Sequence, residues 1–249
     1  MDDHVLQGFK KDFLAIKEKG FVASNRSHDT GIGKTFEDLM LVTENNNHLP
    51  DYKGILELKS KRALSESMFT LFTKSPSFPK GVNSRIREKY GKPDQKFPNC
   101  KVVHSSIFGT KFNNFLGKYG FKIEVDNLAE KISMLVKNLA TDEILEKDIY
   151  HSFSDLKAII DSKCKYIAII YADTKNETGT EFFHFTKAIL LTGLDFSKFV
   201  NLIEKGIIVY DLRLGVYSSG KNAGKPHDHG SGFRVLKRHL NQVFQIQEL

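Results

Sequence analysis

Two acids and a lysine lie close together in residues 50–59, whose sequence is PDYKGILELK. Residues 55–59 predict a short strand, and side chains two apart on a strand share a face, so Glu57 and Lys59 point the same way. Asp51 enters from the preceding turn. Two carboxylates that converge on a hard divalent cation, with an amine beside them, suit Mg²⁺-assisted cleavage of a phosphodiester. Such a spacing also occurs on solvated strands, so the segment alone favours a charged strand face.

The composition is that of a globular protein with a basic surface. The 249 residues are 40% hydrophobic and include 20 Phe, enough for a substantial core in one large domain or two lobes. Lys and Arg outnumber Asp and Glu by 37 to 30, which gives a net charge of +7 and a pI near 9.2. This balance favours a polyanionic partner without requiring one.

Cysteine usage and hydropathy indicate a reducing compartment. Cys100 and Cys164 lie far apart and outside any CxxC motif, so neither a disulfide scaffold nor a cysteine-rich zinc site is expected. No signal peptide is recognisable, and the longest apolar runs, such as residues 166–171, have the length of a strand. We therefore expect a cytoplasmic protein without a membrane anchor.

The elements that must position these residues follow from hydrophobic periodicity and turn residues. Helices are predicted over residues 4–19, 33–41, 63–70, 152–161 and 195–204. Strands are predicted over residues 55–59, 101–104, 121–125, 132–136, 166–172 and 207–217. The strands at 121–125 and 132–136 suggest a hairpin, residues 74–98 a long excursion, and residues 234–243 a closing helix or strand. The pattern predicts a mixed α/β protein.

The sequence DTGIGKT at residues 29–35 imitates a phosphate loop, but His28 stands where that motif needs its first glycine. We expect its glycines to let the turn pass close to another backbone and to begin the helix that carries Glu37. A carboxylate on this helix could lie against the strand of Glu57 and Lys59. The alternative for Glu37 is an ordinary acid in the first turn, favoured by the helix dipole.

The excursion at residues 74–98 is strongly basic. Only Glu88 and Asp94 oppose its positive residues, which are Lys74, Lys80, Arg85, Arg87, Lys89, Lys92 and Lys96. Such a ribbon could neutralise DNA phosphates, with Lys74 nearest the active site and Asn83, Ser84 and Tyr90 as further contacts. The alternative is a solvated basic loop.

A second group of polar residues spans 211–234. Asp211 and Arg213 lie two apart on a predicted strand, where Arg can donate a forked pair to guanine and Asp can accept from cytosine. The loop at 218–225 is basic and includes Lys225, and His227, His229 and Arg234 follow it. We expect these side chains to contact DNA.

Several histidines and one acid have simpler interpretations. Zinc binding by His227 and His229 is disfavoured because no companion pair lies at ligand spacing. Asp228 could simply hold the loop, and His184, between two Phe, is expected to be structural. His104 and His151 give no usable signal.

The chain resembles the MvaI/BcnI restriction endonucleases, which are related to the mismatch-repair nuclease MutH among the PD-(D/E)xK nucleases. The matching stretches occur in family order, at residues 30–39, 51–59, 71–76, 90–92, 183–188 and 224–230. The resemblance implies a MutH-like, restriction endonuclease-like α/β core with a mixed central sheet flanked by helices. It also implies two interleaved lobes, a catalytic lobe at residues 1–100 and a recognition lobe at 101–249, with DNA in the cleft between them.

The resemblance also implies roles for the residues of the site. Asp51, Glu57 and the Leu58 carbonyl would bind Mg²⁺, for which Mn²⁺ could substitute. Lys59 would orient water or stabilise negative charge, and Glu37 would support the lysine or a second ion. Five residues separate Asp51 from Glu57, one more than the resemblance leads us to expect.

The implied function is that of a prokaryotic type II restriction endonuclease. It would be a monomer that cuts double-stranded DNA at a short pseudopalindromic CC-N-GG site, CCWGG or CCSGG, one strand after the other. A cognate DNA methyltransferase is expected in the same genome but not as a bound subunit. The alternatives are a MutH-like nicking enzyme that needs a protein activator, or a DNA-binding module without catalysis.

Overall fold

The computed structural model describes residues 2–26, 30–42, 49–63 and 67–249. By its internal contacts the chain forms two compact units that alternate along the sequence. The first unit comprises Met1–Ser67, Ile159–Asp195 and Asn241–Leu249, and the second comprises Met68–Ala158 and Phe196–Leu240. Residues 68–100, expected in the catalytic lobe, therefore belong to the second unit. The cleft expected between the lobes stays a prediction.

A mixed sheet forms the centre of the first unit, in the order β1-β10-β9-β2 with β14 also on β10. The strands are β1 (Val22–Ala23), β2 (Glu57–Arg62), β9 (Tyr166–Glu177), β10 (Thr180–Thr192) and β14 (Gln245–Glu248). Only β2 and β9 pair in parallel; the other pairs are antiparallel. The central residues of β9, from Ile167 to Ile170, are all buried, as expected of a strand covered on both faces.

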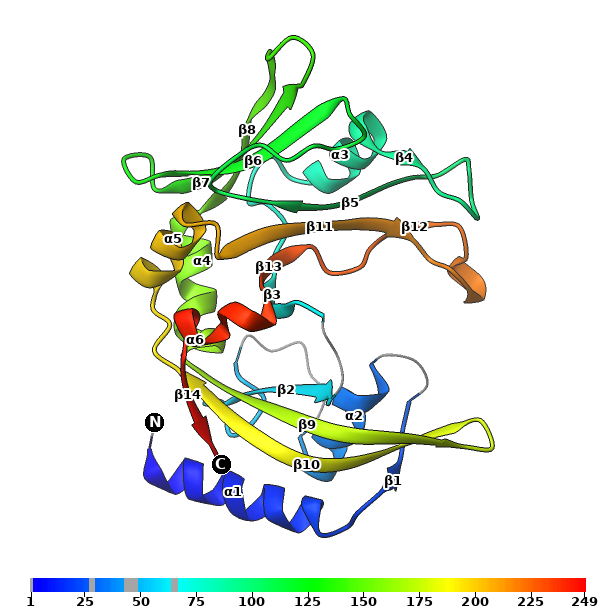
Figure 1. Cartoon of the computed structure of the whole chain (residues 1–249), viewed down its shortest axis with the longest axis vertical. Helices are drawn as coiled ribbons and strands as arrows, with labels where there is room; N and C mark the ends of the chain where they lie inside the picture. The colour runs from blue at the N-terminus through cyan, green and yellow to red at the C-terminus, as the bar shows by residue number, and fades with distance from the viewer. Residues whose placement is uncertain (1, 27–29, 43–48, 64–66) are drawn as a thin grey trace. The chain divides into compact units, whose positions relative to one another are not determined.

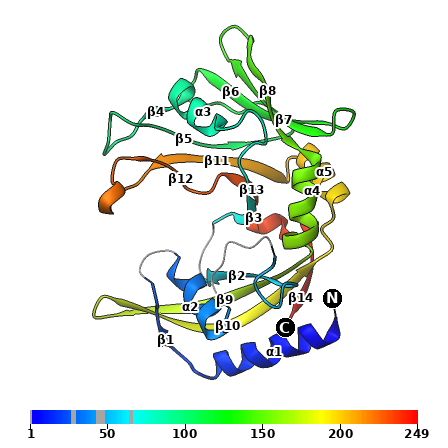
Figure 2. The same cartoon turned by 180° about the vertical axis from the view of Figure 1, so that it is seen from behind.

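Two helices of the first unit pack against this sheet. Helix α1 (Asp3–Lys17) lies along β10 in both views (Figures 1 and 2), and α2 (Gly31–Leu39) contacts β2. Phe9 and Phe13 of α1 and Phe36 of α2 are buried in the core with Phe183 and Phe185. The π-helical turn η1 (Ile160–Cys164) leads into β9.

Two sheets form the second unit. The larger has the order β3-β13-β11-β5-β4, with β12 also on β11, and the smaller has the order β6-β7-β8. The strands of the larger sheet are β3 (Phe69–Thr73), β4 (Lys92–Pro93), β5 (Lys101–Ile107), β11 (Ile208–Val216), β12 (Pro226–Asp228) and β13 (Gly232–Val235). Those of the smaller are β6 (Tyr119–Asp126), β7 (Lys131–Asn138) and β8 (Ile144–Ser152). The core of the second unit contains an aromatic cluster, formed by Phe72, Phe199, Tyr210 and Phe233.

Helices complete the second unit: α3 (Val82–Tyr90), α4 (Phe153–Ile159) and α5 (Phe196–Glu204). The 3₁₀ turns are η2 (Gly220–Asn222) and η3 (Lys237–His239), and η3 is followed by α6 (Leu240–Val243), most of which belongs to the first unit. No helix among the described residues combines the length and apolar character of a membrane span.

The helices predicted at 4–19, 33–41 and 195–204 are confirmed, and so is the hairpin in which Asp126 pairs with Lys131. The helix predicted at 63–70 is wrong where it can be checked: residues 64–66 lie outside the described residues, and β3 begins at 69. The excursion at 74–98 contains α3, whose buried Val82, Ile86 and Tyr90 face the core. Residues 234–243 contain the end of β13, η3 and α6.

Candidate active site and nucleic-acid interface

A tight turn brings Asp51 to the beginning of β2. Tyr52 N donates to Leu56 O over 2.9 Å, and Lys53 and Gly54 turn the chain with φ values of 53° and 67°. The turn therefore spans the five residues between the two acids. Asp51 Oδ2 accepts a hydrogen bond from Leu58 N over 2.9 Å, which ties the carboxylate to the strand that carries Glu57.

Glu57 and Lys59 lie on one face of β2, as predicted. Lys59 Nζ is 3.6 Å from Glu57 Oε1, and Lys163 Nζ is 3.8 Å from Glu57 Oε2. Lys163 belongs to η1, which the parallel pairing of Glu57 with Ile167 brings beside β2. Sequence analysis missed this second lysine because only tertiary structure brings it to the site.

The carboxylate of Glu57 is buried without full compensation. Glu57 is 8% exposed, and its Oε2 has no hydrogen-bond partner among the described residues. Burial raises the pKa of Glu57; Lys59 and Lys163 oppose this effect and Asp51 adds to it. A cation at this carboxylate would offset the unfavourable burial of its charge.

The donor set fits Mg²⁺. Asp51 and Glu57 supply two hard oxygen ligands, and Leu58 offers a backbone carbonyl on the same strand. Within the described residues, no group of three or more His, Cys, Asp or Glu side chains is arranged to bind a metal. Mg²⁺ commonly takes one or two protein carboxylates and completes its shell with water and substrate phosphate, so a larger cluster is not needed.

The raised pKa of Glu57 predicts that its ionised carboxylate lowers the folding stability of the metal-free protein. A carboxyl group whose folded-state pKa is raised favours folding at low pH, and this contribution is lost as the pH rises through the folded-state pKa. Glu57→Gln should therefore stabilise the metal-free protein near pH 8, by roughly 0.5–2 kcal/mol, and have a smaller effect near pH 4. Urea denaturation at both pH values measures this.

The matched control for that measurement is Glu124→Gln, because Glu124 is an exposed acid that also has a lysine partner, Lys122. Its substitution should change stability little. A loss of stability in Glu57→Gln at pH 8, or an equal gain at both pH values, would show that burial of the Glu57 charge does not lower the free energy of unfolding.

Helix α2 carries Glu37 and packs against β2, so the expected proximity of the two elements is confirmed. A side chain at Gly31 would meet Arg26 O at 2.3 Å, so glycine allows the helix to begin close to another backbone, as expected. The catalytic role of Glu37 stays a prediction. Residues 27–29 of the imitated phosphate loop lie outside the described residues.

Four of the seven basic residues at 74–98 make ion pairs within the second unit. Arg85 and Lys89 of α3 both contact Glu146 of β8, at 2.9 and 2.8 Å, and Arg87 contacts Glu88 at 3.0 Å. Lys74 Nζ lies 3.3 Å from Asp155. Because partly exposed pairs are weak, phosphates could displace these partners, and phosphate binding by Lys74, Arg85 and Arg87 stays a prediction.

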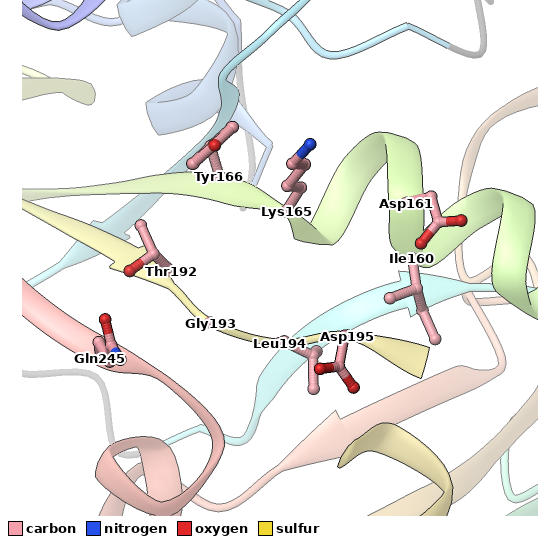
Figure 3. A pocket seen from close by; sticks show the side chains of 9 residues that line it. All are labelled: Ile160, Asp161, Lys165, Tyr166, Thr192, Gly193, Leu194, Asp195 and Gln245. Atoms are coloured by element: carbon pink, nitrogen blue, oxygen red, sulfur yellow. The ribbon is translucent and has the colours of Figure 1, made fainter. Parts of the chain in front are cut away.

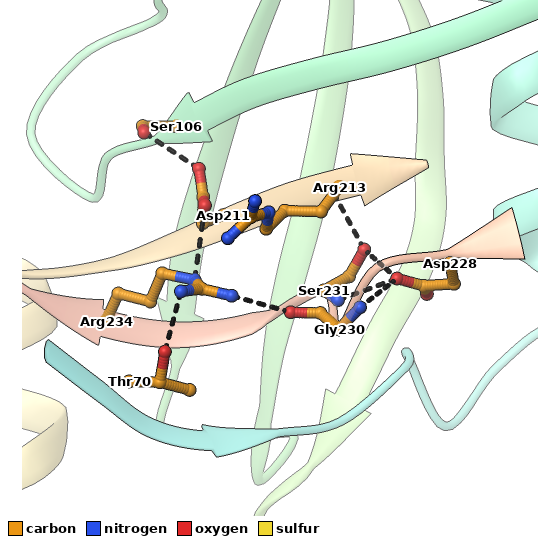
Figure 4. Close-up of polar contacts among 8 residues, drawn as sticks. All are labelled: Thr70, Ser106, Asp211, Arg213, Asp228, Gly230, Ser231 and Arg234. Atoms are coloured by element: carbon orange, nitrogen blue, oxygen red, sulfur yellow. Dashed lines mark hydrogen bonds and ion pairs between the residues drawn. The ribbon is translucent and has the colours of Figure 1, made fainter. Parts of the chain in front are cut away.

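Asp211 and Arg213 differ in their hydrogen-bond and ion-pair partners within the protein (Figure 4). Asp211 accepts a hydrogen bond from Ser106 Oγ over 2.9 Å and pairs with Arg234. Arg213 is exposed on β11, and among the described residues its guanidinium makes no hydrogen bond or ion pair. Arg213 is therefore available to an external acceptor, whereas Asp211 already has internal partners.

Arg234 lies inside the second unit (Figure 4). It is 7% exposed, donates to Thr70 Oγ1 over 2.6 Å and to Gly230 O over 2.9 Å, and has its Nε 3.2 Å from Asp211 Oδ2 in an ion pair without hydrogen-bond alignment. The observed role is to hold β13 to β3 and to Asp211. Base reading by Arg234 stays a prediction.

Asp228 holds its own loop, as the simpler interpretation expected. Its Oδ1 accepts from Gly230 N, Ser231 N and Ser231 Oγ, and its Oδ2 accepts from Asn83 Nδ2 over 2.8 Å. The loop is thereby joined to α3.

The predicted recognition histidines form a stack of rings. His227 stacks on Tyr217 with 4.0 Å between ring centroids, and His229 meets His227 edge-on at 4.6 Å. His229 Nε2 also lies 3.2 Å from Val216 O. Lys225 Nζ donates to Asn222 within the preceding loop. DNA contact by these residues stays a prediction.

Two other histidines are structural. His184 Nε2 lies 3.1 Å from Lys17 O, and the ring contacts Phe21. His151 is buried against Tyr210 and Phe233, and burial lowers its pKa to about 3, so the ring is neutral.

The first unit also contains a cavity of about 630 Å³ (Figure 3). Its lining residues are Ile160, Asp161, Lys165, Tyr166, Thr192, Gly193, Leu194, Asp195 and Gln245. None of the predicted catalytic residues lines this cavity. The candidate active site is therefore a separate place, at the beginning of β2, where Asp51, Glu57 and Lys59 lie.

A mixed α/β fold that places an acid, a glutamate and a lysine at the beginning of one strand is characteristic of restriction endonuclease-like nucleases. The chain belongs to the MvaI/BcnI restriction endonuclease family, whose profile matches residues 10–244. It is therefore a type II restriction endonuclease, a site-specific deoxyribonuclease.

Two solved structures of MvaI support this assignment. The complex of MvaI with its cognate DNA substrate is 34% identical, with a TM-score of 0.89 over 100% of this chain and 99% of that one. MvaI in the absence of DNA is 35% identical, with a TM-score of 0.59 over 98% and 96% of the two chains. The comparison with curated proteins gave no match.

Proposed function

We propose that this enzyme hydrolyses phosphodiester bonds in double-stranded DNA with Mg²⁺, at a pseudopalindromic CC-N-GG site such as CCWGG or CCSGG. The observation that carries the metal dependence is the buried, incompletely paired Glu57 carboxylate beside Lys59, with Asp51 tied to the same strand. Mn²⁺ is expected to substitute, since it accepts the same oxygen ligands. The MvaI complex with cognate DNA supports a duplex substrate.

Positioning and charge would supply most of the catalysis. Lys59 would place its ammonium beside the scissile phosphate, where it stabilises negative charge or orients the attacking water. Asp51, held by Leu58 N, and Glu57 would hold the ion together with the Leu58 carbonyl. A bound Mg²⁺ would add Lewis-acid stabilisation of the phosphate charge. Glu37 would support Lys59 or a second ion.

The second unit would supply recognition. An unpaired guanidinium such as that of Arg213 can donate a forked pair to guanine O6 and N7, which suits a site rich in G·C pairs. His227 and His229 would contact further base edges, and Lys74, Arg85, Arg87 and Lys225 would contact phosphates. Phosphate contacts position the duplex, whereas base contacts provide the specificity.

The biological setting follows from this chemistry. The enzyme would act as a cytoplasmic monomer and cut the two strands in turn. A methyltransferase encoded in the same genome would protect host sites. A DNA-binding module without catalysis would gain nothing from an acid whose burial is unfavourable, so the Glu57 environment favours an enzyme.

Digestion of a plasmid of known sequence tests the proposal. We expect linear fragments in Mg²⁺ or Mn²⁺, no cleavage in EDTA, and mapped ends that all fall within CC-N-GG sites. A matched plasmid without such sites should stay intact. Nicks confined to hemimethylated sites would indicate a MutH-like enzyme, and cleavage that persists in EDTA would contradict the metal site.

A further inference from the structure

We infer that His104 is a specificity-determining residue that contacts a base edge beside Arg213. The inference rests on the proposed function, in which the face of β11 that carries Arg213 reads DNA. It extends that face to β5, a strand in which the sequence gives no sign of recognition.

The sheet register places His104 next to Arg213. The two residues are direct partners in the antiparallel pairing of β5 with β11, and residues opposite each other in such a pair project from the same face. Both are exposed. The next pair on this face, Ser106 and Asp211, is joined by a hydrogen bond of 2.9 Å. His104 and Arg213 thus form the part of this row that is not tied internally.

Gly215 creates the space that His104 and His229 share. A side chain at Gly215 would meet His229 Nε2 at 2.7 Å and His104 Nε2 at 3.3 Å. The two imidazole rings lie 6.4 Å apart, centroid to centroid, and His227 continues the series beyond His229. His104 therefore joins the predicted recognition histidines to Arg213 in one continuous group.

The chemistry of His104 suits base reading. Among the described residues its ring makes no hydrogen bond or ion pair, so both ring nitrogens can serve a ligand. Partial desolvation by the surrounding side chains lowers the pKa of the exposed His104 ring; His229, Arg213 and Lys92 lower it further, and Asp211 opposes them. The ring is therefore neutral at pH 7 and offers one donor and one acceptor. A neutral ring beside an arginine favours a base edge over a phosphate.

The test compares His104→Ala with wild type on the cognate duplex and on duplexes changed at one base pair each. We expect kcat/KM on the cognate duplex to fall by about 10–100-fold, and discrimination to relax at one or two adjacent pairs only. The dependence of binding on salt should not change, because no phosphate contact is lost. His104→Gln, which keeps a donor and an acceptor, should recover part of the loss.

Two further variants make the outcome decisive. His4→Ala, which removes an exposed histidine of α1, should behave as wild type. Arg213→Ala reports on the recognition face itself: if it relaxes specificity while His104→Ala does not, the inference falls and the proposed function stands. If neither variant changes specificity, the proposed recognition face is wrong. A uniform loss over all duplexes with a weaker salt dependence would make His104 a phosphate contact and overturn the inference.

Discussion

Replacing Lys59 with alanine should slow DNA cleavage by about 10²–10³-fold or more while leaving sequence-specific binding nearly unchanged. The Lys59 ammonium lies 3.6 Å from Glu57 on β2, so in the proposed mechanism its loss would remove a positioned positive charge from beside the scissile phosphate. Binding depends on other side chains, which the substitution does not touch. Single-turnover cleavage with excess enzyme, together with gel retardation in Ca²⁺, separates the two effects.

The control is Lys187→Ala, which removes a half-exposed lysine in the middle of β10 that pairs with Glu248 of β14. It should cleave as wild type, because Lys187 is not one of the predicted catalytic residues. Both variants lose one positive charge, so a difference in their cleavage rates reports on the position of the charge and not on its loss alone. If Lys59→Ala and Lys187→Ala retained the same cleavage rate, Lys59 would have no catalytic role.

Replacing Arg234 with methionine should cost about 3–5 kcal/mol of folding free energy. The substitution keeps the volume of the side chain but leaves the Asp211 carboxylate, whose side chain is 13% exposed, without its charged partner. Thr70 Oγ1 and Gly230 O also lose a donor. Urea denaturation measures the loss, and the double variant Arg234→Met, Asp211→Asn should recover part of it.

Arg238→Met serves as the matched control, because Arg238 is exposed and its Nε donates to His239 Nε2 over 3.3 Å instead of pairing with a buried acid. It should change stability by less than about 0.5 kcal/mol. If Arg234→Met kept its stability and instead lost base discrimination, Arg234 would act on DNA directly, as the sequence led us to expect.

The elements that could be predicted from the sequence are those whose apolar residues recur with one clear spacing. The apolar positions of α1 and α5 recur at helical spacing, and both helices were found close to their expected bounds. Residues 69–73, with the sequence FTLFT, form β3 instead of the end of a helix, because a short apolar run does not distinguish the two. The thirteen-residue strand β10 was missed because it has no simple alternation.

The residues of the candidate site also fall into those that local spacing could predict and those that it could not. Glu57 and Lys59 could be placed together because strand geometry alone puts them on one face. Lys163, His104 and the internal partners of Arg234 could not, because each depends on pairing between segments far apart in the chain. Local patterns indicate which residues can do chemistry, whereas the sheet register decides which of them meet.

The most direct test of the catalytic centre is a time course in which wild type and Lys59→Ala are incubated at equal concentration with the same supercoiled plasmid and Mg²⁺. We expect wild type to produce linear DNA with ends inside CC-N-GG sites, and Lys59→Ala to leave the plasmid intact although it binds the target duplex. Equal cleavage by the two proteins, or an intact plasmid with wild type at every enzyme concentration, would contradict a catalytic centre built from Asp51, Glu57 and Lys59.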